Sequence, residues 1–158
     1  MLIQPRDPVF YMDAAYQEAL KALDEGEVPV GAVIVNNNAI IGRGYNRIEQ
    51  LADSTAHAEI IAITAAANHL STWRLDECQL YVTLEPCIMC LGALMQSRIG
   101  SITYGTKDPR LGAVDTRSYR ADLEEAYGFF PTISGGLLAN ECSQLLSSFF
   151  KKIRNKKE

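Results

Sequence analysis

The chain has 158 residues and a hydrophobic content of 47%, which is enough for one sizeable core and argues against a second domain. Its formal net charge of −4 argues against broad, nonspecific binding to nucleic acid, which depends on Lys and Arg that neutralise phosphates. The N-terminus has no basic segment leading into an apolar run, and no stretch holds the roughly eighteen apolar residues of a membrane span. We therefore expect a soluble cytoplasmic protein with a single domain over residues 1–158.

The charge is unevenly distributed along the chain. The last eight residues, KKIRNKKE at 151–158, carry five bases and one acid, a net +4 that leaves −8 for residues 1–150. A solvated, frayed C-terminus is the ordinary explanation of such a basic tail. The alternative is an electrostatic arm for a phosphate backbone.

The N-terminal part of the chain predicts a helix followed by a β-hairpin. Asp7 and Pro8 suit the N-cap and first position of a helix, and apolar residues then recur at helical spacing up to Gly26. The β-branched segments 28–35 and 39–46 are separated by three asparagines, which tolerate left-handed turn geometry. Three glycines in these strands would allow close backbone approach or a bulge: Gly31, Gly42 and Gly44.

The rest of the chain alternates between helices and strands. We predict helices over 57–70, 86–96 and 141–153, and strands over 79–84, 101–105 and 130–136. Turn signals at Asp108-Pro109 and Gly112 indicate an irregular segment after the strand 101–105. This order indicates an α/β fold, a three-layer αβα sandwich with a mixed sheet of roughly five strands. In such folds the site lies at the carboxyl ends of strands, where helices begin.

Two short motifs point to a metal site, H-A-E at 57–59 and P-C-I-M-C at 86–90. Each alone is weak, because H-x-E is usually a surface or capping arrangement and C-x-x-C can be a redox pair or two buried thiols. Without a secretory signal, we expect metal or redox chemistry of this cysteine pair in preference to disulfides. Together, His57, Cys87 and Cys90 supply three ligands and leave the fourth corner of a tetrahedral zinc open for water, the pattern of a catalytic site.

The spacing of these residues also suits hydrolysis. Cys87 and Cys90, at i and i+3 in the first turn of a helix, face the same direction, and the helix N-terminus stabilises their thiolates. Glu59 should face the activated water and move its proton to a ring nitrogen and then to the departing amine. A structural zinc would need a fourth protein ligand, and His69 lies about three helical turns beyond His57, too far along the same helix to supply it.

The H-x-E and P-C-x-x-C pair is a signature of zinc-dependent nucleobase deaminases. The segments EVPVGAVIV, GYN, TAHAEIIAI, LYVTLEPCIMC and SRIG resemble those of the bacterial tRNA-specific adenosine deaminases over about residues 10–111, and similarity resumes over GLLANECSQLLSSFFKKIR. The resemblance implies membership of the cytidine and deoxycytidylate deaminase superfamily with its cytidine-deaminase-like fold. It also implies a zinc-containing homodimer that converts adenosine to inosine at the wobble position of a tRNA anticodon.

The resemblance further implies roles for individual residues. It makes His57, Cys87 and Cys90 the ligands of one zinc ion per chain and Glu59 the proton shuttle. Asn46 would hydrogen-bond the purine, and the backbone N–H groups of Ala58 and Cys87 would hold the product oxygen or the attacking hydroxyl.

Three further side chains are implied to contact the RNA. Asp108 would contact the ribose or phosphate beside the target base, although in D-P-R-L it is at least equally a turn former. Phe149 and Phe150 resemble an aromatic pair near the RNA, but they belong to an apolar helical stripe, so at least one is expected in the core. Apart from the resemblance, the amphipathic ring of Trp73 could stack a base, although its place before a strand favours packing in the core or at an interface.

The similarity breaks between residues 112 and 136, which read GAVDTRSYRADLEEAYGFFPTISGG and lack the family's G-x-x-G-S and Asn-His-Arg segments. Because those segments help to position RNA in the family, the substrate could instead be smaller. The leading hypothesis is therefore a tRNA adenosine deaminase, and the alternative is a deaminase of a free base or nucleoside such as guanine, cytosine or adenosine. A non-catalytic zinc or redox module is the third possibility, and Glu59 argues against it, because a structural site needs no unligated carboxylate.

Overall fold

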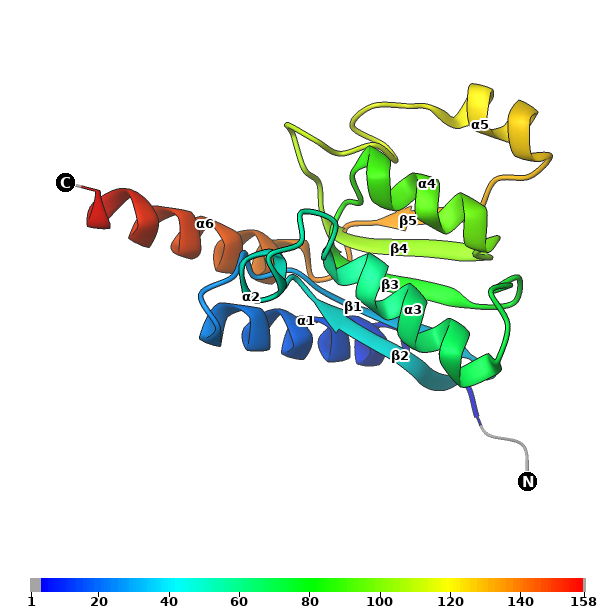
Figure 1. Ribbon diagram of the computed structural model, residues 1–158, viewed down its shortest axis with the longest axis horizontal. Helices are drawn as coiled ribbons and strands as arrows, with labels where there is room; N and C mark the ends of the chain where they lie inside the picture. The colour runs from blue at the N-terminus through cyan, green and yellow to red at the C-terminus, as the bar shows by residue number, and fades with distance from the viewer. Residues whose placement is uncertain (1–3, 158) are drawn as a thin grey trace.

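The computed structural model describes residues 4–157, which fold around one five-stranded sheet with the strand order β2-β1-β3-β4-β5 (Figure 1). Its strands are β1 (Gly31–Asn36), β2 (Ala39–Tyr45), β3 (Gln79–Leu84), β4 (Ser101–Thr106) and β5 (Thr132–Gly135). Its helices are α1 (Pro8–Asp24), α2 (Ile48–Leu51), α3 (Ala58–Leu70), α4 (Ile88–Ser97), α5 (Arg120–Tyr127) and α6 (Ala139–Lys156). Strand β1 runs antiparallel to β2 and β3, whereas β4 runs parallel to β3 and β5. The predicted mixed sheet of five strands is confirmed.

The predicted N-terminal helix and hairpin are both present. The Asp7 carboxylate accepts a hydrogen bond from the Val9 N–H at 2.8 Å and caps α1. Asn37 and Asn38 turn the hairpin with positive φ angles of 50° and 65°. Strand β1 begins later than predicted because Pro29 has no N–H to donate to a ladder.

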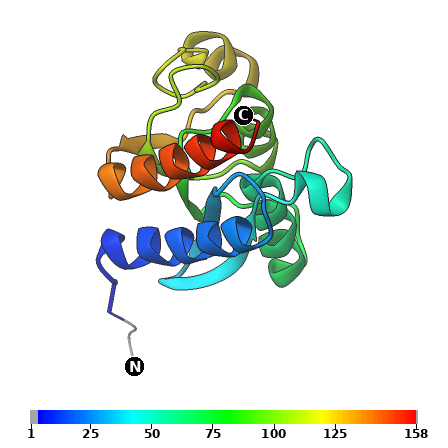
Figure 2. The ribbon, with the colours of Figure 1, turned by 90° about the vertical axis from the view of Figure 1, so that its left-hand side faces the viewer.

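The side chains of the central strands alternate between two helical layers. On β1, Ala32 and Ile34 belong to the main core, which also includes residues of α3 and α4. Val33 and Val35 point to the other face and pack with residues of α1. Helix α6 lies on the same face as α1, as Figure 2 shows. The predicted αβα sandwich is therefore confirmed.

Helix α3 packs on β2 at backbone contact distance. A Cβ added to Gly42 would lie 2.5 Å from the carbonyl oxygen of Ala62, and one added to Gly44 would overlap the carbonyl oxygen of Ala58. Only glycine permits this approach. Because Ala58 is the first residue of α3, the contact with Gly44 fixes the start of the helix that follows His57.

Helix α5 was not predicted, because it lies within the segment expected to be irregular. No residue of this helix is buried, so its sequence carries no apolar stripe. Arg120 pairs with Glu124 one turn later at 3.4 Å, and Gly128 ends the helix with a φ of 79°. Helix α4 begins at Ile88, two residues after the predicted start.

The core expectation for Trp73 is wrong. Its side chain is 60% exposed, and the guanidinium of Arg74 lies 5.3 Å from the centre of its ring.

No helix within residues 4–157 is long and apolar enough to cross a membrane.

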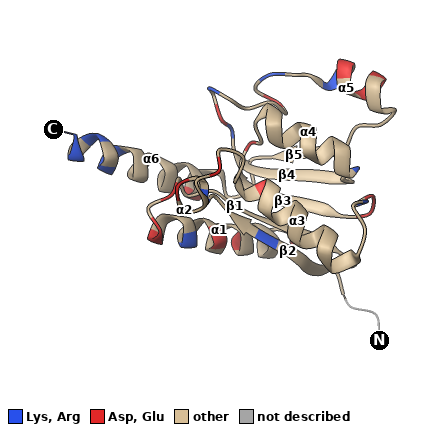
Figure 3. Cartoon of the chain, viewed as in Figure 1, with Lys and Arg blue, Asp and Glu red and all other residues tan. Residues whose placement is uncertain are grey.

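Helix α6 is longer than the predicted segment and extends beyond the edge of the sheet (Figure 1). Its buried side chains, Cys142, Leu146 and Phe149, lie in the N-terminal and middle turns. Residues 151–156 of the basic tail are helical, and Figure 3 shows Lys and Arg gathered at this end of the helix.

Candidate active site

The two predicted metal-binding motifs meet where helices α3 and α4 begin. His57 is the N-cap residue of α3, and Cys87 is the N-cap residue of α4. Cys90 lies in the first turn of α4 and is fully buried, whereas His57 and Cys87 are partly exposed. The chain enters α4 directly from the carboxyl end of β3, which is where ligand sites of α/β sheets lie.

The geometry of these three side chains fits a tetrahedral zinc ion. The His57 Nδ1 atom lies 3.7 Å from the sulfur of Cys87 and 3.5 Å from that of Cys90. Zinc bonds of about 2.3 Å to sulfur and 2.0–2.1 Å to nitrogen at a tetrahedral angle would separate these atoms by about 3.6 Å. Within residues 4–157, these three residues form the one group of at least three His, Cys, Asp or Glu side chains whose ligand atoms all lie within 4.8 Å of one another. The group could therefore hold a metal ion.

The electrostatics of the thiols also favour a cation. The hydrogen bond from Cys90, opposed by burial and aided by His57, lowers the pKa of Cys87 to about 4. The pKa of Cys90 is raised by its hydrogen bond to Cys87 and by burial. The hydrogen bond with Cys87 raises the pKa of His57, although burial opposes the shift. A divalent cation bound by both sulfurs would replace these shared protons.

Glu59 is the buried carboxyl group of the site. It lies in the first turn of α3, is 4% exposed, and is not part of the group of ligand atoms. Burial raises its pKa to about 7, against the opposing effects of hydrogen bonds and of His57. A carboxyl group with a pKa near neutrality can both accept and return a proton during a reaction.

Two of the predicted substrate contacts are hydrogen-bonded to each other. Asn46 follows β2 and is 7% exposed, and its Oδ1 atom accepts a hydrogen bond of 2.8 Å from the Ala58 N–H. This N–H, which the resemblance assigns to the hydroxyl or the product oxygen, is thus bound to Asn46 in this structure. The bond also joins the end of β2 to the start of α3, and so it places Asn46 beside the residue after His57.

Asp108 forms the turn that the sequence predicts. Its carboxylate accepts hydrogen bonds from the N–H groups of Arg110 at 3.0 Å and Leu111 at 3.1 Å. The turn interpretation is therefore confirmed, and a contact of Asp108 with substrate remains a prediction.

The two phenylalanines of α6 differ in exposure. Phe149 is 8% exposed and belongs to the buried side of the helix, whereas Phe150 is 45% exposed. Their rings meet edge to face with centroids 5.4 Å apart. The expectation that at least one of them is in the core is confirmed, and Phe150 is the one with a solvent-facing ring.

Sequence reasoning missed Glu85, a second buried carboxylate beside the site. It is 2% exposed and follows the last residue of β3. Burial would raise the pKa of this group, but hydrogen bonds from Thr116, Asp115 and Asp108 outweigh that effect and lower it. The available signal was an acidic residue directly after a buried strand, where a charge needs partners.

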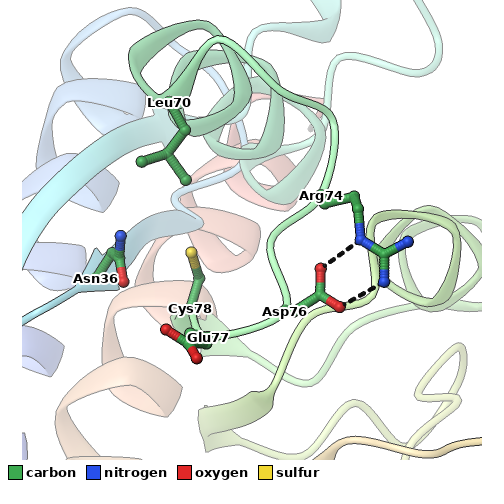
Figure 4. Close-up of a pocket in the computed structure, with 6 residues that line it drawn as sticks. All are labelled: Asn36, Leu70, Arg74, Asp76, Glu77 and Cys78. Carbon is green, nitrogen blue, oxygen red and sulfur yellow. Dashed lines mark hydrogen bonds and ion pairs between the residues drawn. The ribbon is translucent and has the colours of Figure 1, made fainter.

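A hollow elsewhere on the molecule is separate from this site. It has a volume of about 190 Å³ and lies at the opposite end of α3, as Figure 4 shows. Its lining residues are Asn36, Leu70, Arg74, Asp76, Glu77 and Cys78. Helix α3 has 13 residues, so its two ends are roughly 20 Å apart. Two hydrogen bonds of 3.0 and 2.7 Å pair the guanidinium of Arg74 with the carboxylate of Asp76 at this hollow.

Comparison with known proteins agrees with this site. A family model for MafB19-like deaminases matches residues 7–154. The tRNA-specific adenosine deaminase of Bacillus subtilis (strain 168) is 44% identical over 148 residues, which cover 94% of this chain and 91% of that protein. A structure from studies of A-to-I editing by tRNA:A34 deaminases at the wobble position has a TM-score of 0.81 and 40% identity, covering 87% of this chain and 99% of that chain.

A structural relative of lower sequence identity is named for a different substrate. The guanine deaminase from Nitrosomonas europaea has a TM-score of 0.76 and 26% identity, covering 94% of this chain and 88% of that chain. The shared fold and the His, Cys and Glu arrangement define the class of this protein as a deaminase, an aminohydrolase. The chain belongs to the MafB19-like deaminase family, and the resemblance of its motifs to the tRNA-specific adenosine deaminases is confirmed.

Proposed function

We propose that this protein is a zinc-dependent enzyme that hydrolyses adenosine to inosine at the wobble position of tRNA. The observation that carries the proposal is the triangle of His57, Cys87 and Cys90 ligand atoms beside the buried, unligated carboxyl of Glu59. The substrate part of the proposal rests on the tRNA-specific adenosine deaminase of Bacillus subtilis, which is 44% identical over nearly the whole chain.

In this proposal His57 Nδ1 and the sulfurs of Cys87 and Cys90 hold one zinc ion per chain. Bound there, zinc would act as a Lewis acid that makes water nucleophilic near neutral pH. The two thiolates balance the charge of the ion, and the N-termini of α3 and α4 stabilise the thiolates. Three protein ligands leave room at the metal for the reaction.

Glu59 moves the protons of the reaction. It accepts a proton from water as the water oxygen bonds to C6 of adenine, and it returns this proton to ring atom N1. A second proton from the new hydroxyl then passes through Glu59 to the amino group, which leaves as ammonia when the C6–N bond breaks. Adenosine and water thus give inosine and ammonia, and Glu59 ends in the state in which it began.

Five groups position the substrate in this scheme. The Asn46 amide contacts the purine, and the backbone N–H groups of Ala58 and Cys87 face the developing hydroxyl. When substrate enters, the Ala58 N–H would exchange its 2.8 Å bond to Asn46 for a bond to the reacting oxygen. Asp108 contacts the ribose or phosphate beside the target, and the exposed ring of Phe150 offers a surface on which a splayed base could stack.

The alternative is deamination of a free base or nucleoside by the same chemistry. The likeness to the guanine deaminase from Nitrosomonas europaea favours it, as does the break in motif similarity between residues 112 and 136. The tRNA assignment is preferred because the tRNA-specific relatives combine 44% and 40% identity with coverage of 94% and 87% of this chain. The guanine deaminase from Nitrosomonas europaea is 26% identical, and that from Bacillus subtilis reaches 38% identity over only 65% of this chain.

Two further features of the proposal concern the whole molecule. Residues 1–158 form one catalytic domain of a cytoplasmic enzyme, and two such chains pair as the homodimer that the family resemblance implies. The basic end of α6 contacts the phosphate backbone of the tRNA, because it projects past the sheet and gathers the helical residues Lys151, Lys152, Arg154 and Lys156, with Lys157 as the C-cap.

A substrate comparison tests the proposal. Purified zinc-loaded protein is incubated with total tRNA and, in parallel, with guanine, cytosine, adenosine and cytidine. Inosine is scored as A-to-G changes in sequenced tRNA, and released ammonia is measured for the small substrates. The proposal expects inosine confined to the first anticodon position, whereas ammonia from a free base with unedited tRNA would select the alternative.

A further inference from the structure

The Glu85 carboxylate is enclosed by the loop that follows β4. Four backbone N–H groups and one hydroxyl of this loop donate hydrogen bonds to its two oxygens. The donors are the N–H groups of Asp108 (3.2 Å), Val114 (3.1 Å), Asp115 (2.9 Å) and Thr116 (2.8 Å) and the hydroxyl of Thr116. A single buried charge therefore fixes both ends of the segment 108–116.

The loop backbone packs directly on this carboxylate. A Cβ added to Gly112 would overlap the Glu85 carboxyl group, so glycine is required for the approach. The Ala113 N–H donates to the Pro86 carbonyl at 2.9 Å, which ties the loop to the segment just before α4. The hydroxyl of Tyr104 on β4 donates to the carboxylate of Asp115.

The same short segment holds the loop and a proposed metal ligand. Glu85 precedes Cys87 by two residues, and the residue between them is proline, whose backbone is restricted. The Glu85 N–H donates to the Thr106 carbonyl at 2.9 Å, so Glu85 is itself anchored to β4. The distance between Cys87 and the loop is therefore set by a rigid connection.

We propose that Glu85 is a positioning residue, which holds the segment 108–116 beside the metal site so that Asp108 meets the nucleotide bearing the target base. This inference rests on the proposed function, because it assigns Asp108 to substrate. Glu85 itself contacts neither substrate nor metal in the proposal.

This arrangement explains how the sequence of the loop can depart from the family pattern while the loop backbone keeps its position. Four of the five donors to Glu85 are main-chain N–H groups, which nearly any sequence supplies, and only Thr116 contributes a side chain. Glu85 therefore fixes the path of the backbone mainly through main-chain groups, and this path does not depend on the side chains of the exposed residues Arg110 and Leu111.

Glu85→Gln tests the proposal, because it keeps the shape of the side chain but turns an amide N–H₂ towards N–H donors. Hydrogen exchange is measured on the zinc-loaded protein, together with kinetics on an anticodon stem-loop. We expect exchange of the Val114, Asp115 and Thr116 amides to accelerate at least tenfold, while the amides in the middle of α3 keep their rates. KM for the stem-loop should rise at least fivefold, with kcat changed less than threefold. Unchanged loop exchange, equal acceleration throughout the protein or an unchanged KM would overturn the proposal.

Gly112→Ala provides an independent route to the same loop. Its added Cβ would push the backbone off the carboxylate without altering any charge, so the variant should reproduce the exchange and KM changes of Glu85→Gln. Gly92→Ala is the matched control, since a Cβ at Gly92 meets no atom within 4 Å. This control should leave loop exchange unchanged. If Gly112→Ala also leaves it unchanged, the packing argument is wrong.

Thr116→Val provides a second test of the same hydrogen bonds if Glu85→Gln does not fold. This variant removes one of the five donors, so a smaller acceleration, of about threefold, is expected at the loop amides alone. The exchange measurement is also independent of the proposed function. If wild-type protein fails to edit the stem-loop, the proposed function is wrong, while exchange still shows whether Glu85 holds the loop.

Discussion

The Asn46 side chain and the Ala58 backbone N–H are joined by a 2.8 Å hydrogen bond that links the end of β2 to the first residue of α3. Ala58 carries one of the N–H groups at a helix start that have no partner within the helix, so Asn46 acts as its cap from a distant part of the chain. The same bond places the amide of Asn46 next to the residues that surround the candidate metal site.

Asn46→Ala should therefore affect both stability and turnover. Removing the cap leaves the Ala58 N–H unpaired in a buried place and should lower the free energy of unfolding by about 1–2 kcal/mol. Zinc content should be unchanged, whereas kcat/KM for a tRNA anticodon stem-loop should fall by at least tenfold. Urea unfolding, metal analysis and steady-state kinetics check these outcomes. A variant with unaltered kinetics would show that Asn46 serves only as a cap.

Cys87→Ala should abolish zinc binding. The substitution removes one of three proposed ligands, and the remaining His57 and Cys90 are too few to hold zinc in a stable site. Cys78→Ala is the matched control, because Cys78 is buried, with 2% exposure, and lies outside the ligand group. Metal analysis of the purified variants should give about one zinc per chain only in the control. Normal zinc content in Cys87→Ala would show that the ligand set is wrong.

Removal of the metal should expose one cysteine to alkylation. Cys87 is partly exposed and has a pKa of about 4, so its thiolate is available at neutral pH once a chelator has taken the zinc. Cys142 is 1% exposed, and burial raises its pKa to about 11, so it should stay unmodified in folded protein. Mass mapping after iodoacetamide treatment, with and without chelator, distinguishes the sites. Labelling of Cys142 before Cys87 would contradict the structure.

Substitution of the two phenylalanines of α6 should have different effects, one on stability and the other on RNA binding. Phe149→Ala should cost about 3–5 kcal/mol of unfolding free energy, because the ring lies in the core. Phe150→Ala should cost less than about 1 kcal/mol and instead raise KM for the stem-loop. Denaturant unfolding and kinetics on both variants make the comparison. Equal destabilisation by the two substitutions would contradict the exposure of Phe150.

Much of this fold follows from local sequence signals. The cap at Asp7, the asparagine turn and the glycines of β2 each act through conformational preference or size, and each gave a prediction that the structure confirms. Helix α5 was missed because it buries no side chain, so its sequence lacks the periodicity on which prediction depends. The core alternative for Trp73 was wrong because its exposure depends on how the turn after α3 faces solvent, which neighbouring residues do not reveal.

The site shows the same division between local and tertiary information. The residue types and spacing of His57, Cys87 and Cys90 predicted one metal group, and the structure brings their ligand atoms together. Glu85 was missed because its five donors lie 23 to 31 residues further along the chain and are mostly main-chain groups. No residue type marks such partners in a sequence. The bond between Asn46 and Ala58 was hidden for the same reason.

Deamination of adenosine in tRNA through Glu59 is best tested by comparing wild-type protein with Glu59→Gln on total tRNA. Both proteins are brought to the same zinc content, and inosine at the first anticodon position is measured by sequencing. We predict inosine with the wild type and an at least thousandfold lower rate with the variant, because the zinc ligands remain while the proton carrier is lost. Substantial editing by zinc-loaded Glu59→Gln, or an absence of inosine with the zinc-loaded wild type, would contradict this mechanism.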